Sequence, residues 1–221
     1  MKRNPSVSEQ KAPRTVTATA VLAAVLVLMS FTPFGYLHIG VVSMSLLMIP
    51  VAVGAVTCGI CSAVILSVLF GVTSFLQCFG LDSFGTLLYS VSPSMTVIAC
   101  ILPRLLAGLC TGLTGMRTKK LGLCSYAVSG FCGAMFNSVF TFLALVLCFW
   151  NSSAFRTAIA EMGIETDSLF SFFTAFLGFN FMFEAFACLA ATFLVGSLME
   201  RAGMISAADP FEHNLKGLLN R

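Results

Sequence analysis

The chain has 221 residues, of which 58% are hydrophobic and only 10% are charged, and its mean hydropathy is +0.97. This composition excludes a soluble globular domain, which would carry far more charged surface. The formal net charge is only +3. The positions of the basic residues relative to the membrane account for it, so we expect no nucleic-acid partner.

Repeated apolar runs of about 18–25 residues predict membrane-spanning helices. We expect an all-α membrane protein with six spans over residues 15–200, between cytoplasmic tails at 1–14 and 201–221. The second run is short and meets the third at Thr57-Cys58-Gly59. The predicted spans lie near residues 15–32, 42–57, 58–79, 95–116, 122–149 and 169–199.

The basic residues predict the orientation of these spans. Ten of the twelve lie before the first span, between the fourth and fifth, or after the sixth. Because basic residues accumulate in cytoplasmic loops, both termini are expected in the cytoplasm. Five or seven spans would place the basic C-terminal tail on the wrong side of the membrane.

The first span carries two pairs of small residues four positions apart, Thr19 with Ala23 and Ala20 with Ala24. Small residues at this spacing allow two helices to approach closely in lipid. They pack either within this protein or against a separate membrane subunit, and the sequence leaves both interpretations open.

The largely apolar stretch from Thr32 to Phe75 contains several positions that are expected to break a helix. A Pro-Gly turn follows the first span, Pro50 lies in the second, and Gly71-Val72-Thr73-Ser74 interrupts the third. Broken helices persist at membrane depth only where protein or a water-filled cavity surrounds them. We therefore expect the wall and lid of a solute pocket here. Its candidate contact residues are Tyr36 and His38 in the loop and Thr73 in the third span.

Four polar residues fall at similar depths in the last three spans. Arg104 lies roughly 14 Å from the outer end of the fourth span, and Asn137 roughly 18 Å from that of the fifth. Asn180 lies roughly 17 Å into the sixth span, with Glu184 one turn deeper on the same face. A buried arginine needs an anionic partner or a water-filled cavity, and its planar fork suits a carboxylate.

Two interpretations of this layer remain. Either Arg104 and Glu184 neutralise one another while the asparagines tie the helices together, or the layer binds a small polar solute whose carboxylate meets Arg104. We favour the binding site, because four polar groups in one layer exceed what bundle packing requires.

Motifs of enzymes and metal sites are missing. The chain has no G-x-x-x-x-G-K-[ST] phosphate loop, no H-E-x-x-H and no G-x-S-x-G. Cys58-x-x-Cys61 has the spacing of a metal or redox site, but no further ligands are near it in the sequence. We expect neither an enzyme, nor a metal, nor a cofactor.

Several short motifs occur in a characteristic order: Thr32-Pro33-Phe34-Gly35, Ile49-Pro50-Val51, Phe70-Gly71-Val72-Thr73-Ser74 and Pro103-Arg104-Leu105-Leu106, followed by Asn137 and Asn180-x-x-x-Glu184. In this order they resemble the substrate-binding components of energy-coupling factor vitamin transporters, most closely the pantothenate-type members. The resemblance covers roughly residues 15–200.

This resemblance implies a six-helix subunit in a prokaryotic plasma membrane, with a vitamin site near the outer face under two loops. It also implies partners, namely a membrane coupling protein, on which Ala20 and Ala24 dock, and two cytoplasmic ATPases. Pantothenate would place its carboxylate on Arg104 and its hydroxyls and amide on Asn137 and Asn180. Met48 stands where similar sequences often have His, so components for pyrimidine precursors, riboflavin or folate are alternatives. An autonomous secondary transporter and a purely structural membrane protein are the hypotheses outside this family.

Overall fold

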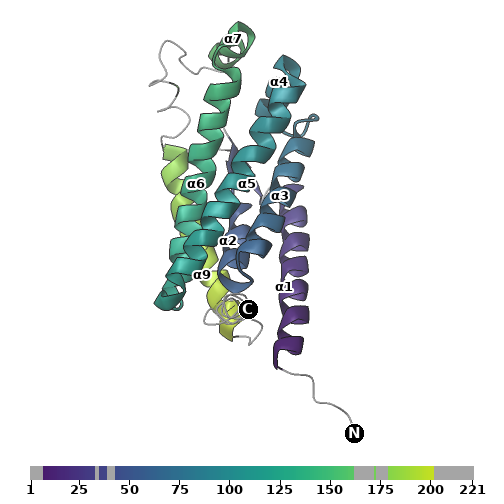
Figure 1. Ribbon diagram of the computed structural model, residues 1–221. Coiled ribbons are helices and arrows are strands. Elements are labelled where there is room, and N and C mark those ends of the chain that lie inside the picture. The colour runs from purple at the N-terminus through teal and green to yellow at the C-terminus, as the bar shows by residue number, and fades with distance from the viewer. Residues whose placement is uncertain (1–6, 33–34, 39–42, 162–171, 173–178, 202–221) are drawn as a thin grey trace, which may run out of the picture.

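The computed structural model describes residues 7–32, 35–38, 43–161, 172 and 179–201. This part of the chain consists of helices and one short β-hairpin (Figure 1), which confirms the predicted helical class. In chain order the elements are α1 (Val7–Ser30), β1 (Tyr36–His38), β2 (Ser43–Ser45), α2 (Met48–Thr57), α3 (Ile60–Gln77), α4 (Ser83–Val91), α5 (Pro93–Thr118), the 3-10 turn η1 (Lys119–Leu121), α6 (Cys124–Phe149), α7 (Ser153–Glu161) and α9 (Phe179–Arg201).

Four helices of the described part are long and apolar enough to cross a membrane: α3, α5 continued by η1, α6, and α9 from Phe181 onward. The apolar part of α1, Thr15–Ser30, and the ten-residue α2 are shorter. The bounds predicted for the third, fourth and fifth spans agree with α3, α5 and α6 to within two residues. The beginning of the predicted sixth span falls largely outside the described residues.

The helices run alternately up and down, so that the chain reverses at each end of the bundle (Figure 1). The start of α1, the turn η1 and the end of α9 lie at one end, whereas α4 and α7 lie at the other. The first of these ends carries Arg117, Lys119, Lys120 and Arg201. The six-span count and the cytoplasmic placement of the termini stay predictions.

The helix predicted over 42–57 is wrong in its first part. Residues Ser43–Ser45 form β2, which pairs antiparallel with β1 so that Tyr36 faces Ser45 and His38 faces Ser43. The backbone N–H of Leu46 continues the pairing by donating to the carbonyl of Gly35 at 3.0 Å. Apolar composition alone does not distinguish such a strand from the start of a helix.

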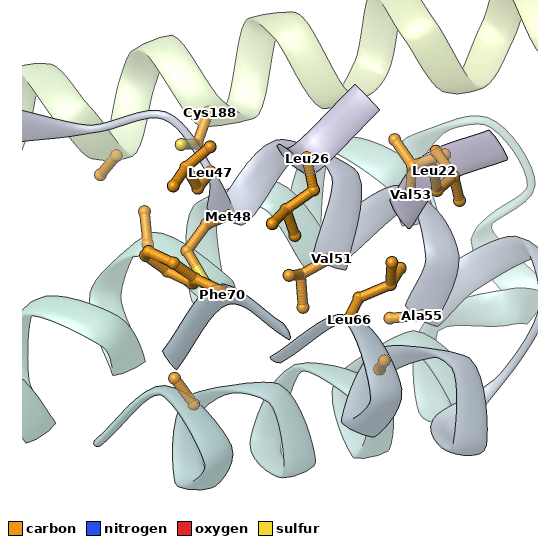
Figure 2. Packing of buried hydrophobic residues seen from close by; sticks show 14 residues of the cluster. Leu22, Leu26, Leu47, Met48, Val51, Val53, Ala55, Leu66, Phe70 and Cys188 are labelled. Carbon is orange, nitrogen blue, oxygen red and sulfur yellow. The ribbon is translucent and has the colours of Figure 1, made fainter. Parts of the chain in front are cut away.

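Pro50 begins a helix rather than breaking one. It is the third residue of α2, where the backbone N–H has no intrahelical acceptor and the missing donor of proline costs nothing. Every residue of α2 except Ile49 is buried, because α1, α3, α5, α6 and α9 surround it. Figure 2 shows Met48, Val51, Val53 and Ala55 of this helix among side chains of α1, α3 and α9.

The interruption predicted at Gly71–Ser74 is also wrong, because α3 continues through it from Ile60 to Gln77. Gly71 allows a close helix contact instead: a Cβ atom there would lie 3.1 Å from the Cα atom of Ile101 on α5. The hydroxyl of Thr73 donates to the carbonyl of Phe70 at 3.0 Å, within its own helix.

Glycines on α5 bring this helix close to its neighbours, as Gly108-x-x-x-Gly112 predicts. A Cβ atom on Gly108 would overlap the side chain of Ser67 on α3, and one on Gly112 would lie 3.2 Å from the Cα atom of Ile60. Gly115 approaches the backbone of Ala55 on α2 equally closely, since a Cβ atom there would lie 3.1 Å from its carbonyl oxygen.

The two segments between predicted spans at 80–94 and 150–168 each contain a short helix. Asp82 caps α4 by accepting a hydrogen bond from the N–H of Gly85 at 2.7 Å, and the hydroxyl of Ser152 accepts one from the N–H of Phe155 at 3.3 Å at the start of α7. Acidic and hydroxyl side chains are the usual N-caps, so these two residues were the available sequence signals. Apolar side chains of α4, α5, α6 and α7, together with Phe172, form a separate cluster at this end: Leu88, Ala99, Leu145, Phe149, Phe155, Ile159 and Phe172.

A buried side chain holds the end of α1 against α3. The amide of Gln77, only 5% exposed, donates from Nε2 to the carbonyl of Ser30 at 2.6 Å. The Ser30 hydroxyl in turn donates to the carbonyl of Leu26 at 2.8 Å. These bonds fix the point at which the chain leaves α1 for the hairpin.

We expect Gln77→Met to destabilise the protein, because the thioether fills a similar volume but leaves the Ser30 carbonyl without its donor. An unsatisfied buried acceptor costs about 1–3 kcal/mol, which thermal unfolding in detergent would record as a lower Tm. Ser90→Ala, which removes an exposed hydroxyl bonded within α4, is the control and should change Tm little. Equal Tm values for Gln77→Met and wild type would contradict the role of this bond.

Candidate functional site

Arg104 is positioned by the proline that precedes it. Pro103 lies inside α5 and has no N–H to donate to the carbonyl four residues earlier, that of Ala99. The guanidinium of Arg104 supplies the missing donor, since Nη1 lies 2.8 Å from the Ala99 oxygen. The Pro-Arg pair therefore turns the side chain toward the α4 end of the helix and holds it there.

The rest of the Arg104 guanidinium is only partly satisfied. Its central carbon lies 5.6 Å from the centroid of the Phe70 ring on α3, at the distance of a cation–π contact. Its Nε–H is buried and has no hydrogen-bond partner among the described residues. A buried donor without a partner is destabilising, and an anionic ligand would supply the acceptor.

Glu184 on α9 is the other ionisable residue of the candidate site. It is 7% exposed and faces two polar side chains of α6. The amide of Asn137 donates to Glu184 Oε1 at 3.5 Å and the hydroxyl of Ser138 donates to Oε2 at 3.4 Å. Both distances are at the long limit of a hydrogen bond, and the buried Oδ1 of Asn137 has no donor within the described ranges. This half of the site can therefore accept further hydrogen bonds.

Arg104 and Glu184 do not contact one another directly. In the described part of the chain no ion pair joins them, since Arg104 bonds to the Ala99 carbonyl and Glu184 to Asn137 and Ser138. A buried carboxyl group without a cation in direct contact recovers little of its desolvation penalty. The purely structural interpretation of this layer requires a salt bridge between Arg104 and Glu184, and such a bridge is not what holds these helices together.

The structure brings together part of the predicted site. Asn137 on α6 and Glu184 on α9 are hydrogen-bonded to each other, Arg104 lies on α5, which packs against α6, and Thr73 is buried on α3 one turn beyond Phe70. For Tyr36, His38 and Asn180 the structure describes the backbone alone, so their contacts with a ligand stay predictions.

Sequence reasoning missed two residues of this region. Ser138 follows Asn137 directly, and a polar pair inside an apolar span was the available signal. Phe70 begins one of the motifs quoted above, but nothing in the sequence indicates that its ring lies beside Arg104. In the described ranges no three His, Cys, Asp or Glu side chains gather closely enough to hold a metal ion.

The two small-residue pairs on α1 point in different directions. Thr19 and Ala23 face the bundle: the Thr19 and Ser62 hydroxyls lie 2.9 Å apart, and Ala23 packs against the central core. Ala20 and Ala24 are exposed on the opposite side. Packing within the protein therefore accounts for the first pair, whereas the second lies on a free face.

A family comparison agrees with this architecture. The model of the family described as "ECF transporter, substrate-specific component" matches residues 14–196, which is most of the chain and includes every described residue of the site. No curated protein matches the chain in sequence. With four apolar membrane-capable helices around a polar layer and a family match of this extent, the chain belongs to the substrate-specific components of ECF transporters.

Proposed function

We propose that this protein is the vitamin-binding subunit of an ECF importer and that pantothenate, or a vitamin of similar chemistry, binds at the layer formed by Arg104, Asn137 and Glu184. The observation that carries the proposal is that the half-buried Arg104 and the buried Glu184 are not joined by an ion pair in the described part of the chain, while Arg104 bonds to the Ala99 carbonyl and Glu184 accepts only long hydrogen bonds from α6. Each half has an unused polar atom, the Nε–H of Arg104 and the Oδ1 of Asn137.

A carboxylate with neutral polar groups fits this arrangement. The carboxylate would accept the hydrogen bond from Arg104, and charge-assisted bonds of this kind are roughly twice as strong as neutral ones. Hydroxyl and amide N–H groups of the same ligand would donate to Glu184 and to Asn137 Oδ1. A ligand that supplies both kinds of group would satisfy both halves of the layer at once.

Membership of the family makes the chain a membrane transporter subunit that associates with an energy-coupling module. We propose that a membrane coupling protein binds the exposed face of α1 around Ala20 and Ala24, and that two cytoplasmic ATPases drive transport. The basic end of the bundle then faces the cytoplasm, with both termini, and six segments cross the membrane, the second of them made of β2 together with the short α2.

We expect Ala24→Leu to weaken association with the coupling protein without changing vitamin binding, because a larger side chain prevents close helix approach at an exposed site. Co-purification of the coupling protein measures the first effect and calorimetric titration of the vitamin the second. The matched control is Ala190→Leu, the same substitution at an exposed position of α9. Equal co-purification of both variants would remove this face of α1 from the docking surface.

A binding screen of water-soluble vitamins against the purified protein tests the proposed function. We expect pantothenate to raise Tm and to bind without ATP, and transport to require the partner proteins. Binding of riboflavin, folate or a pyrimidine precursor in place of pantothenate would keep the family role but reject this substrate. Accumulation of substrate by the protein alone in liposomes would favour a secondary transporter. The absence of a shift with any vitamin would favour a structural role.

A further inference from the structure

Two cysteines meet where α3 ends beside α5. The sulfur atoms of Cys78 and Cys100 lie 3.7 Å apart, and the residues are only 3% and 5% exposed. All nine cysteines of the chain are free thiols and all lie in the described part. Within it, this is the one pair whose sulfurs are in hydrogen-bonding contact.

The pair also contacts a third element. The thiol of Cys78 donates to the carbonyl of Ser74 at 3.5 Å, and the first turn of α4 packs on the same sulfur, since a Cβ atom on Gly85 would lie 2.8 Å from it. Cys100 lies on α5 four residues before Arg104, and therefore on the same face one turn nearer the α4 end. A covalent bond between the thiols would join α3 to α5 directly beneath α4.

We propose that Cys78 and Cys100 form a redox modification site, at which a small hydroperoxide converts the two thiols into a reversible intrachain disulfide. One thiolate attacks the terminal oxygen of the peroxide, giving a sulfenic acid and releasing hydroxide or an alcohol. The second thiol then attacks that sulfur, forms the S–S bond and releases water. Two thiols are oxidised and one peroxide is reduced by two electrons.

The geometry favours formation of the disulfide over persistence of the sulfenic acid. A disulfide needs the sulfurs to approach from 3.7 Å to about 2.05 Å, which small rotations of the two side chains can supply. Burial keeps larger thiol reagents away from the pair, whereas hydrogen peroxide is about the size of a water molecule. A partner thiol already in contact with the sulfenic acid reacts faster than one from solution.

Thiol counting on the full-length purified protein tests this site. After hydrogen peroxide treatment, denaturation and maleimide labelling, we expect the intact mass to show two fewer labels than the untreated protein and full recovery after dithiothreitol. Cys78→Ala and Cys100→Ala should each abolish this paired loss. Cys110→Ala, which alters a different cysteine of α5, should retain it. A disulfide-linked peptide from a non-reducing digest should contain both residues.

A second measurement separates a crosslink from other chemistry. Because the bond would join residues in different helices, peroxide should raise the Tm of wild type by several degrees, reversibly, and leave Cys78→Ala unchanged. A stable gain of one oxygen without loss of two thiols would overturn the proposal. The proposal would also be overturned if a chelator, but not a reductant, restored maleimide labelling of the two thiols. That result would indicate a soft metal ion that bridges the two sulfurs. Neither readout uses a vitamin, so failure here is distinct from failure of the proposed transport function.

Discussion

Arg104→Ala is expected to weaken binding of an anionic vitamin about 5- to 150-fold, which corresponds to the roughly 1–3 kcal/mol of a hydrogen bond to a charged group. The guanidinium is held at the Ala99 carbonyl and still has an unpartnered Nε–H, so the variant loses a donor that the ligand would otherwise use. Calorimetric titration of pantothenate into the detergent-solubilised protein measures the effect.

Because Arg104 also satisfies a backbone carbonyl, its removal affects stability as well as binding, and a second pair of variants separates the two effects. Pro103→Ala restores the backbone N–H that can bond to the Ala99 oxygen. In that background, Arg104→Ala should cost less stability than in wild type but should still lower the affinity for the vitamin. If the double variant binds as tightly as Pro103→Ala alone, Arg104 serves only the helix and not the ligand.

Gly108→Val is expected to cause the largest loss of stability among single substitutions at the α3–α5 contact. Its side chain would enter the space occupied by Ser67, and even a Cβ atom would lie 3.1 Å from the carbonyl oxygen of Ala63. Overpacking of a tight contact typically costs about 1–3 kcal/mol, and here backbone on the facing helix limits relaxation. A fall in Tm and in the yield of monodisperse protein would record it.

The compensating change at Ser67 provides the control for this prediction. Ser67→Gly removes the Cβ atom and the hydroxyl that a side chain at position 108 would meet, and this buried hydroxyl has no hydrogen-bond partner among the described residues. Gly108→Ala should therefore be destabilising alone and largely rescued in the Gly108→Ala/Ser67→Gly double variant. A double variant no more stable than Gly108→Ala would mean that the loss arises elsewhere.

The long helices were predictable because lipid imposes one rule on every residue of a span. Backbone groups must be bonded within the segment and side chains must be apolar, so the bounds of α3, α5 and α6 follow from hydropathy alone. The hairpin before α2 was not predictable, since Ser43–Ser45 pairs with Tyr36–His38, and hydropathy does not indicate that these residues form a strand. Gly71 shows the same limit: a glycine that breaks a helix and one that admits a neighbour look alike in sequence.

The residue types of the candidate site could be predicted from the sequence, but the hydrogen-bond partners of these residues could not. Charged and amide side chains are rare in apolar spans and usually functional, which identified Arg104, Asn137 and Glu184. Their contacts depend on how helices turn about their axes, which hydropathy does not specify. Neither the bond from Arg104 to the Ala99 carbonyl nor that from Ser138 to Glu184 could be derived from spacing, although Pro103 indicates which carbonyl lacks a donor.

The buried helix α2 has a consequence for the order in which the protein assembles. It is ten residues long, too short to span the membrane alone, and it packs against helices that are synthesised after it, up to α9 at the far end of the described chain. A segment that finds its neighbours so late cannot complete its packing while the protein emerges from the ribosome. The contact of α2 with α9 can form only after the last helix inserts, so defects in α9 should also disturb the packing of α2 near the start of the chain.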